Sequence, residues 1–212
     1  MAITRLNTNA VGTSVDLTSN VTGTLPTGNG GTGATSFNPA SFVKISKSTI
    51  SSGTAQIDFN GLFSSTYDKY FVYANDVEIS ANAGLYLYVL IGGSEISSTY
   101  STSAQAYDAG GNSRSYGSTN LSRIVMNSNA NRSGTTYTHS FQFYISNPLA
   151  TDQHKTINGI YGGWTDQAAD TTQVGNFSGA YRGATTALSG IRIATSNSAT
   201  FDSGDVTLYG VL

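Results

Sequence analysis

The chain of 212 residues contains no cysteine, so neither disulfide bonds nor thiolate chemistry stabilises or activates it. Charged residues make up only 10% of the sequence, and its ten Lys and Arg residues are scattered singly. No Lys/Arg stripe is available to neutralise a run of phosphates, which argues against nucleic-acid binding. Solubility therefore rests on hydroxyl and amide side chains, a surface chemistry that suits proteins exposed outside the cell.

Long apolar runs are also missing. No window approaches the roughly 18 uninterrupted apolar residues of a membrane span, so we expect no insertion into a membrane. Residues 1–5 open no hydrophobic signal region, so we expect no secretory export of this chain.

The first 41 residues differ in composition from the rest. Gly, Thr, Asn and Ser dominate them and aromatic residues are almost absent, so they cannot form a core alone. We predict an extended N-terminal anchor and stalk over residues 1–41, on the order of 100 Å long at roughly 3.3 Å per residue. Disorder is the alternative. Residues 42–212 hold nearly all the aromatic residues and are expected to fold as one head domain without this arm.

Short runs of β-branched and aromatic residues follow from Phe42 onward, separated by clusters of Gly, Asn, Asp and Ser. This pattern predicts an all-β domain, and no ten-residue window keeps a helical period. Residues 97–119 have weak periodicity and are expected to form a long excursion or an irregular edge. Strands are expected near 42–46, 54–59, 70–79, 85–91, 120–126, 136–146, 155–163, 173–182, 188–195 and 204–211.

Alternation is cleanest in residues 136–146, which predict one buried face made of Tyr137, His139, Phe141, Phe143 and Ile145. Residues 85–91 are apolar on both faces, so that strand needs cover on both sides. Ten strands with turns between them favour two packed antiparallel sheets, a β-sandwich of jelly-roll-like form.

A Gly-rich element, GTLPTGNGGTG, occupies residues 23–33. It resembles the G-x-L-P-x-x-N-G-G-T-G element of bacteriophage tail-fibre proteins, which lies just before their C-terminal domains. The proline fixes φ, and the glycines allow positive φ or close backbone approach where chains meet at a trimer axis; a flexible linker would use the same glycines. The motif positions are Leu25, Pro26, Asn29, Gly30, Gly31 and Gly33.

The predicted head carries a similarity of its own. The sequences FNGLF at 59–63 and YDKY at 67–70 look like the opening of a β-domain found in phage fibre tips. Residues 201–212 resemble the F-x-x-G-x-x-x-L-Y-G-φ strand that ends the same group. The two similarities bracket nearly the whole head, while its middle is divergent.

The resemblance implies a homotrimeric structural component of a bacteriophage virion, a short fibre or adhesin for attachment to the host surface. It further implies an exterior place on tail or head, synthesis in the host cytoplasm, an arm that binds other virion proteins, and a host glycan or receptor as partner. The chain departs from long tail fibres, since it has no large anchoring domain before the motif. A capsid-attached head fibre or decoration protein is the alternative, and a tail-associated glycan-degrading enzyme is a third interpretation.

Residues for catalysis or metal binding are sparse. His139 is expected on a packed strand face and His154 in an exposed polar turn, so neither indicates a Ser-His-Asp site. Asp166 with Asp170 is at most a hint of a calcium loop, and no pair of carboxylates suited to glycoside hydrolysis is indicated. We therefore expect no enzyme activity, no metal and no cofactor.

Aromatic residues beside polar turn residues are the remaining candidates for a site. A flat ring stacks on the apolar face of a sugar while amide and carboxylate groups bind its hydroxyls. For each ring the alternative is a place in the core or at a subunit interface. Host-binding loops are expected far from the arm, around 100–116 and 164–170. The candidate glycan-binding residues are Trp164, Asp166, Tyr107, Tyr116, Tyr181 and Arg182.

Overall fold

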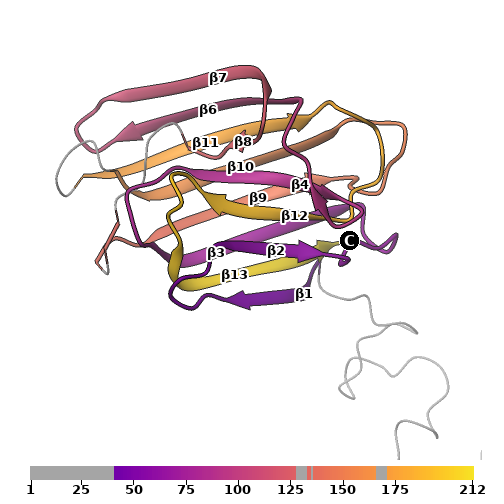
Figure 1. Ribbon diagram of the computed structural model, residues 1–212, viewed down its shortest axis with the longest axis horizontal. Helices are drawn as coiled ribbons and strands as arrows, with labels where there is room; N and C mark the ends of the chain where they lie inside the picture. The colour runs from indigo at the N-terminus through magenta and orange to yellow at the C-terminus, as the bar shows by residue number, and fades with distance from the viewer. Residues whose placement is uncertain (1–40, 128–132, 135, 166–170) are drawn as a thin grey trace, which may run out of the picture. The chain divides into compact units, whose positions relative to one another are not determined.

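The computed structural model describes residues 41–127, 133–134, 136–165 and 171–212, and in these ranges it contains strands and no helix (Figure 1). The predicted arm and its fibre motif, at residues 1–40, lie outside this part of the chain, as does Asp166. The described residues accordingly hold no helix that could cross a membrane. The strands are β1 (Phe42–Thr49), β2 (Gln56–Asn60), β3 (Lys69–Ile79), β4 (Leu85–Ile91), β5 (Ser94–Glu95), β6 (Tyr100–Asp108), β7 (Ser113–Leu121), β8 (Ile124–Val125), β9 (His139–Ser146), β10 (Lys155–Trp164), β11 (Thr172–Tyr181), β12 (Gly190–Thr195) and β13 (Phe201–Val211).

The strands form two antiparallel sheets of unequal size. The larger sheet has eight strands in the order β1-β13-β3-β9-β10-β11-β6-β7, and the smaller has the order β2-β12-β4-β5, with β8 also paired to β4. The prediction of an all-β domain is confirmed. The strand order departs from an eight-stranded jelly roll, because the consecutive strands β9, β10 and β11 pair as a meander within one sheet.

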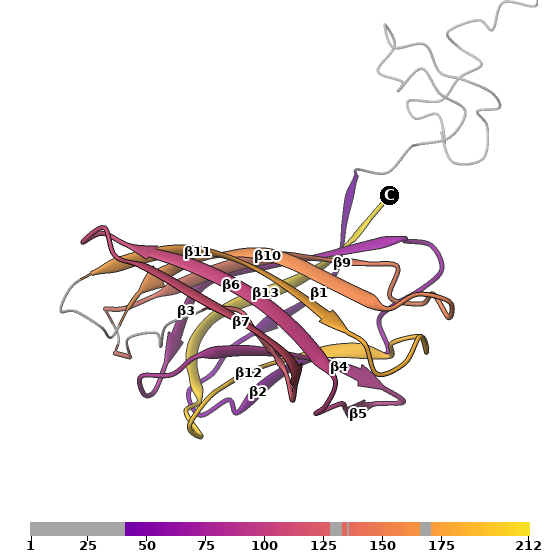
Figure 2. The same cartoon turned by 90° about the horizontal axis from the view of Figure 1, so that it is seen from above.

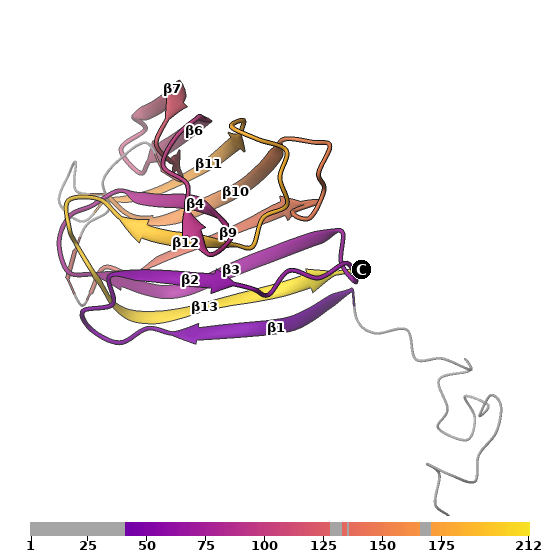
Figure 3. The same cartoon turned by 45° about the vertical axis from the view of Figure 1, so that its right-hand side comes forward.

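The two sheets pack face to face, as the edge-on view in Figure 2 and the turned view in Figure 3 show. One continuous core of buried side chains from both sheets lies between them. Tyr100 of β6 ties the layers together, because its hydroxyl accepts a hydrogen bond from the Val89 N–H of β4 at 2.9 Å and donates one to the Ile96 carbonyl at 2.8 Å. Burial raises the pKa of Tyr100 well above its ordinary value, so the ring stays neutral.

Strand β9 confirms the alternation expected there. His139, Phe141, Phe143 and Ile145 are buried, whereas Tyr144 on the opposite face is 41% exposed. This strand lies in the middle of the larger sheet, between β3 and β10, so its inward side chains are covered by the smaller sheet while its other face points outward.

The structure of residues 97–119 differs in part from the prediction. They form β6 and most of β7, a hairpin at one edge of the larger sheet whose register shifts once, between Tyr100 and Ser101, so the expected edge position holds and the long excursion is wrong. The inward side chains of β6 include Thr102, Ala104 and Ala106, which are small, so the period of two is hard to see by hydrophobicity alone. The hairpin places Tyr107 on the sheet surface instead of in a loop.

The two-sided apolar strand at residues 85–91 is β4, and its neighbours in this chain supply part of the cover that it needs. Leu85, Leu87 and Val89 are in the core. On the other face the Arg123 guanidinium lies 4.0 Å from the centre of the Tyr86 ring, a cation–π contact.

The opening and closing segments of the head pack against each other. The Tyr67 ring lies over the backbone of Gly210, where an added Cβ atom would come within 2.5 Å of the ring, so only glycine fits without a shift. Tyr67 in turn packs edge-on against Tyr70, with ring centroids 5.8 Å apart. The Y-x-x-Y pattern near residue 67 and the L-Y-G pattern near residue 209 are therefore two halves of one packing arrangement.

Candidate functional site

The outer face of the larger sheet is the surface that stands out chemically. We define it as the side chains of β1, β13, β3, β9, β10, β11, β6 and β7 that point away from the smaller sheet. On β3, β6, β9 and β11 their exposure follows from the strand period of two, because about every second side chain of these strands is buried.

Four adjacent strands, β9, β10, β11 and β6, make the middle of this face. Among their described outward-facing residues none is Asp, Glu, Lys or Arg. The charges on these strands point inward instead, at Lys155 and Asp108, which are both buried. The outward set consists mainly of hydroxyl, amide and apolar side chains: Ser140, Gln142, Tyr144, Ser146, Thr156, Asn158, Ile160, Thr172, Val174, Asn176, Ser178, Ala180, Ser101, Ser103, Gln105 and Tyr107.

Large apolar side chains gather on the same face. Among the described residues seven such side chains are exposed, and six of them lie here, the exception being Leu212. Val174 is 60% and Ile160 is 50% exposed. Val174 lies directly opposite Tyr107 in the register, and Ile160 lies opposite Gln142. The six are Phe42, Tyr73, Tyr107, Tyr144, Ile160 and Val174.

An aromatic cluster forms the part of this face near β1. The Phe71 ring lies 4.9 Å from the Tyr144 ring, 5.3 Å from the Phe42 ring and 6.1 Å from the Tyr209 ring, centroid to centroid. The charged residues of the face are confined to this side. Lys47 and Asp205 form an exposed ion pair at 2.9 Å, and hydrogen bonds from Lys47 and Thr49 lower the pKa of Asp205.

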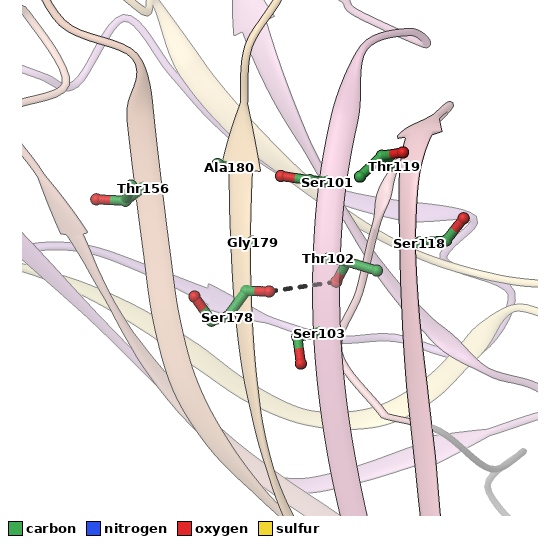
Figure 4. Close-up of a pocket in the computed structure, with 9 residues that line it drawn as sticks. All are labelled: Ser101, Thr102, Ser103, Ser118, Thr119, Thr156, Ser178, Gly179 and Ala180. Atoms are coloured by element: carbon green, nitrogen blue, oxygen red, sulfur yellow. Dashed lines mark hydrogen bonds between the residues drawn. The ribbon is translucent and has the colours of Figure 1, made fainter.

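Shallow hollows cross the face. Figure 4 shows one of about 260 Å³ over β10, β11, β6 and β7, whose polar lining is hydroxyl groups alone, at Ser101, Ser103, Ser118, Thr119, Thr156 and Ser178. Beneath it the Thr102 hydroxyl contacts the Ser178 carbonyl oxygen at 3.4 Å. A second hollow, also of about 260 Å³, lies between Tyr107, Val174 and Ile160. These hollows suit contact with an uncharged surface.

The outer face of the smaller sheet is different in kind. Arg192 of β12 donates two hydrogen bonds of 2.8 Å to the Asp58 carboxylate and one of 2.9 Å to Glu95, which joins three strands by charge. The hydrogen bonds from Asp58 and Glu95 raise the pKa of Arg192 above its already high value. This face therefore carries fixed and mutually satisfied charges.

The predicted glycan-binding residues do not come together. Tyr107 lies on the outer face and is 49% exposed, whereas Tyr181 is buried and packs on Tyr100 at 5.5 Å, so its ring is not available to a sugar. Tyr116 is partly buried against the core. Trp164, at the end of β10, packs edge-on against Tyr137 at 5.4 Å. Arg182 donates a hydrogen bond to the Asn120 side chain at 3.0 Å.

The strand register defines two ends of the larger sheet. Phe42 begins β1 at the end where β9 stops, because it pairs with Val211, and the rows continue to Lys69 and Ser146. The β6–β7 turn after Asp108 lies at the opposite end (Figure 1). Trp164 lies at that end too, on the far side of β11, because Asp108 pairs with Gln173 and Trp164 with Thr172. In this turn the Asn112 side chain and N–H donate hydrogen bonds to the Asp108 carboxylate, and these bonds lower the pKa of Asp108.

The two histidines are placed as expected where the structure describes them. His139 is buried, and its Nδ1 atom lies 2.9 Å from the Tyr161 hydroxyl. An added Cβ atom on Gly163 would come within 2.2 Å of the same nitrogen, so the backbone closes over the ring. His154 lies in the exposed turn before β10. No three His, Cys, Asp or Glu side chains gather as metal ligands in the described ranges.

Comparison with known proteins gives no relative: no family model, no curated protein and no solved structure matches this chain.

Proposed function

We propose that this chain is a structural protein of a bacteriophage virion, a short homotrimeric fibre or adhesin that attaches to the host surface. Residues 1–41 act as the arm that binds other virion proteins, and residues 42–212 act as a β-sandwich head. The packing of the Tyr67 ring over Gly210 carries the proposal, because the two head segments that resemble phage fibre tips meet there. The fibre-type element at residues 23–33 precedes this head in the sequence.

Host attachment belongs at the end of the head opposite Phe42. The arm enters the head at Phe42, so an arm fixed to the particle turns the other end outward. That end carries the hydrogen-bonded turn after Asp108 and the rings of Trp164 and Tyr137. Rings and amide groups there suit a host glycan or receptor, with weak single sites strengthened by several copies on one particle.

Binding rather than catalysis is the function that the described side chains favour. The ring of His139 is enclosed by Tyr161 and the backbone of Gly163, where no substrate reaches it. The charges of the smaller sheet are engaged with one another in the Arg192 network. A capsid-attached head fibre or decoration protein is the alternative within the same class.

Labelling of intact particles tests the proposal. Antibodies against the full chain, applied to virions of the phage that encodes it, are expected to mark the particle exterior in electron micrographs. Label on the tail supports the fibre, and label on the capsid supports the alternative. Particles that contain no such protein would exclude both.

Adsorption of phage to host cells tests the attachment surface. Trp164→Ala is expected to lower adsorption because it removes the ring at the outward end, while the mass and thermal stability of the purified protein stay nearly unchanged. Leu212→Ala is the control, since it removes an exposed apolar side chain at the Phe42 end, away from the half-buried Trp164. Equal adsorption by both variants would remove Trp164 from the attachment surface.

A further inference from the structure

We infer that the outer face of the larger sheet is the surface through which copies of this chain pack against one another. The inference rests on the proposed function only for the number of copies, three. The contact itself is argued from the chemistry of the face.

The exposed apolar area on this face is concentrated rather than scattered. Ile160 and Val174 together line two neighbouring hollows, one that reaches Tyr73 and one that reaches Tyr107. Single exposed apolar residues are ordinary on a protein surface, but a contiguous patch marks a contact site. The side chains at its centre are aliphatic, which favours a protein surface over a sugar ring as the occupant.

The absence of outward charge on β9, β10, β11 and β6 suits self-association in particular. In a contact between copies the face offers no separate set of opposite charges, and a charge left unpaired there loses hydration without gain. The described outward residues of these four strands avoid that cost, while the Lys side chains stay at the β1 side. Ser, Thr, Asn and Gln supply hydrogen bonds to an equivalent surface.

The size of the face is sufficient for a stable contact. Eight strands about 4.8 Å apart and about 30 Å long give a surface of about 1,000 Å². Specific interfaces bury about 800 Å² per partner, so this face has the area of one such interface, which a trimer divides between two neighbours. A bound glycan of a few sugars would cover only a fraction of it.

The point where the arm enters the head agrees with this arrangement. Phe42 lies on the same outer face, against Phe71. Copies that pack through this face therefore bring the starting points of their arms to the shared side. The Gly-rich element, which precedes Phe42 in the sequence, resembles segments that meet at a trimer axis.

The mass of the full chain in solution tests the inference. By light scattering at micromolar concentration, the native protein is expected to have about three times the 22.1 kDa of one chain. Val174→Lys and Ile160→Lys each place a charge at the centre of the face, and we expect the mass to fall about threefold. Gln56→Lys places the same charge on an exposed outward position of β2 in the smaller sheet and should leave the mass unchanged.

The outcomes distinguish this contact from association through the arm and from glycan binding. Both residues are outward-facing and half or more exposed, so the variants should keep the native circular dichroism spectrum. If Val174→Lys misfolds, Ile160→Lys decides alone. A multimer that survives both substitutions would overturn the inference and assign association to the arm, whereas a monomeric native chain would overturn both the contact and the homotrimer. If the native protein is monomeric and the two Lys variants lose binding to host glycans, the face is reassigned to a glycan. Virion labelling is independent of every one of these results.

Discussion

The outer faces of the two sheets differ in charge and in how far their exposed side chains are covered. On the smaller sheet Arg192 joins Asp58 and Glu95, and Arg123 covers Tyr86, so the chain supplies both charge and cover. On the larger sheet the described outward residues of the four middle strands are uncharged, and Ile160 and Val174 remain open. On the smaller sheet the charges and the Tyr86 ring have their partners within one chain, whereas the outer face of the larger sheet is suited to contact with a further molecule.

The low overall charge of the chain is therefore distributed unevenly. The chain has only 22 Lys, Arg, Asp and Glu residues, and the described parts of the four middle strands of the larger sheet turn theirs inward or omit them. Solubility of the exposed parts then rests on the smaller sheet, the turns and the β1 edge.

Lys155→Met is expected to have the largest effect on stability. Lys155 is the charge of β10 that points inward, and its ammonium group donates to the carbonyl oxygens of Gln153 at 2.8 Å and Thr185 at 3.1 Å, as well as to Ala150. Removal leaves partly buried acceptors without this charged donor, which costs up to about 3 kcal/mol of unfolding free energy. Urea denaturation measures this. Lys44→Met, at an exposed position of β1, is the control and should change stability little.

Alkaline pH should lower the stability of the core between the two sheets. Burial raises the pKa of Tyr100 and of Tyr161, so both rings stay neutral in the folded state while the unfolded chain ionises above its ordinary pKa of 10.0. Their stabilisation is present below pH 10 and is lost above it, by up to about 1.4 kcal/mol per pH unit for each ring. The pKa of Lys155 is lowered instead, so Lys155 makes the folded state more stable as the pH rises, but only up to its ordinary pKa of 10.5.

Thermal unfolding followed from about pH 9 to about pH 11.5 is the measurement. The melting temperature should fall more and more steeply above about pH 10.5. Tyr100→Phe should start from a lower stability, since the Val89 N–H loses its acceptor, and should then show a shallower fall. A flat profile would mean that neither hydroxyl is buried.

The fold could be predicted from the sequence in outline. The alternation of β9 is visible because large apolar and aromatic residues recur at every second position there. The hairpin of β6 and β7 escapes prediction, since Ala104 and Ala106 mark the buried face and Ser, Gly and Tyr fill the rest. Small inward side chains near the sheet edge carry a weak hydrophobic pattern.

The candidate surface could be predicted only in fragments. The sequence indicates Tyr107, but as a loop residue, and it suggests an exposed role for Tyr181, which packs on Tyr100. The composition holds a further indication, because residues 139–146 and 172–181 contain no Asp, Glu, Lys or Arg at all. In the fold these strands are neighbours of β10 and β6. No local sequence pattern specifies this pairing.

A substitution on the smaller sheet should have a moderate and salt-dependent effect. Arg192→Met leaves the Asp58 and Glu95 carboxylates facing each other without a cation, and their exposed fractions of 33% and 30% temper the loss. We expect about 1 to 2 kcal/mol of unfolding free energy at low salt and less at about 0.5 M NaCl. Denaturation at both salt concentrations checks this. An effect that is equal at the two concentrations would mean that packing, not charge, holds this face.

Lys47→Met should have the smallest effect. The Lys47–Asp205 pair on the β1 side of the larger sheet is more exposed, at 45% and 43%, and water competes for both groups. We expect a change below about 0.5 kcal/mol in the same assay. A larger loss would show that the charged edge of this sheet resembles the Arg192 network after all.

Protection of a single thiol tests the contrast between the faces most directly. Because the chain has no cysteine, Val174→Cys and Gln56→Cys each introduce one reactive group, on the larger and the smaller sheet respectively. In the assembled protein we expect a maleimide reagent to label the Val174→Cys variant about tenfold or more slowly than the Gln56→Cys variant, with equal rates after unfolding in urea. Equal rates in the native protein would contradict the account, because the outer face of the larger sheet would then be open to water.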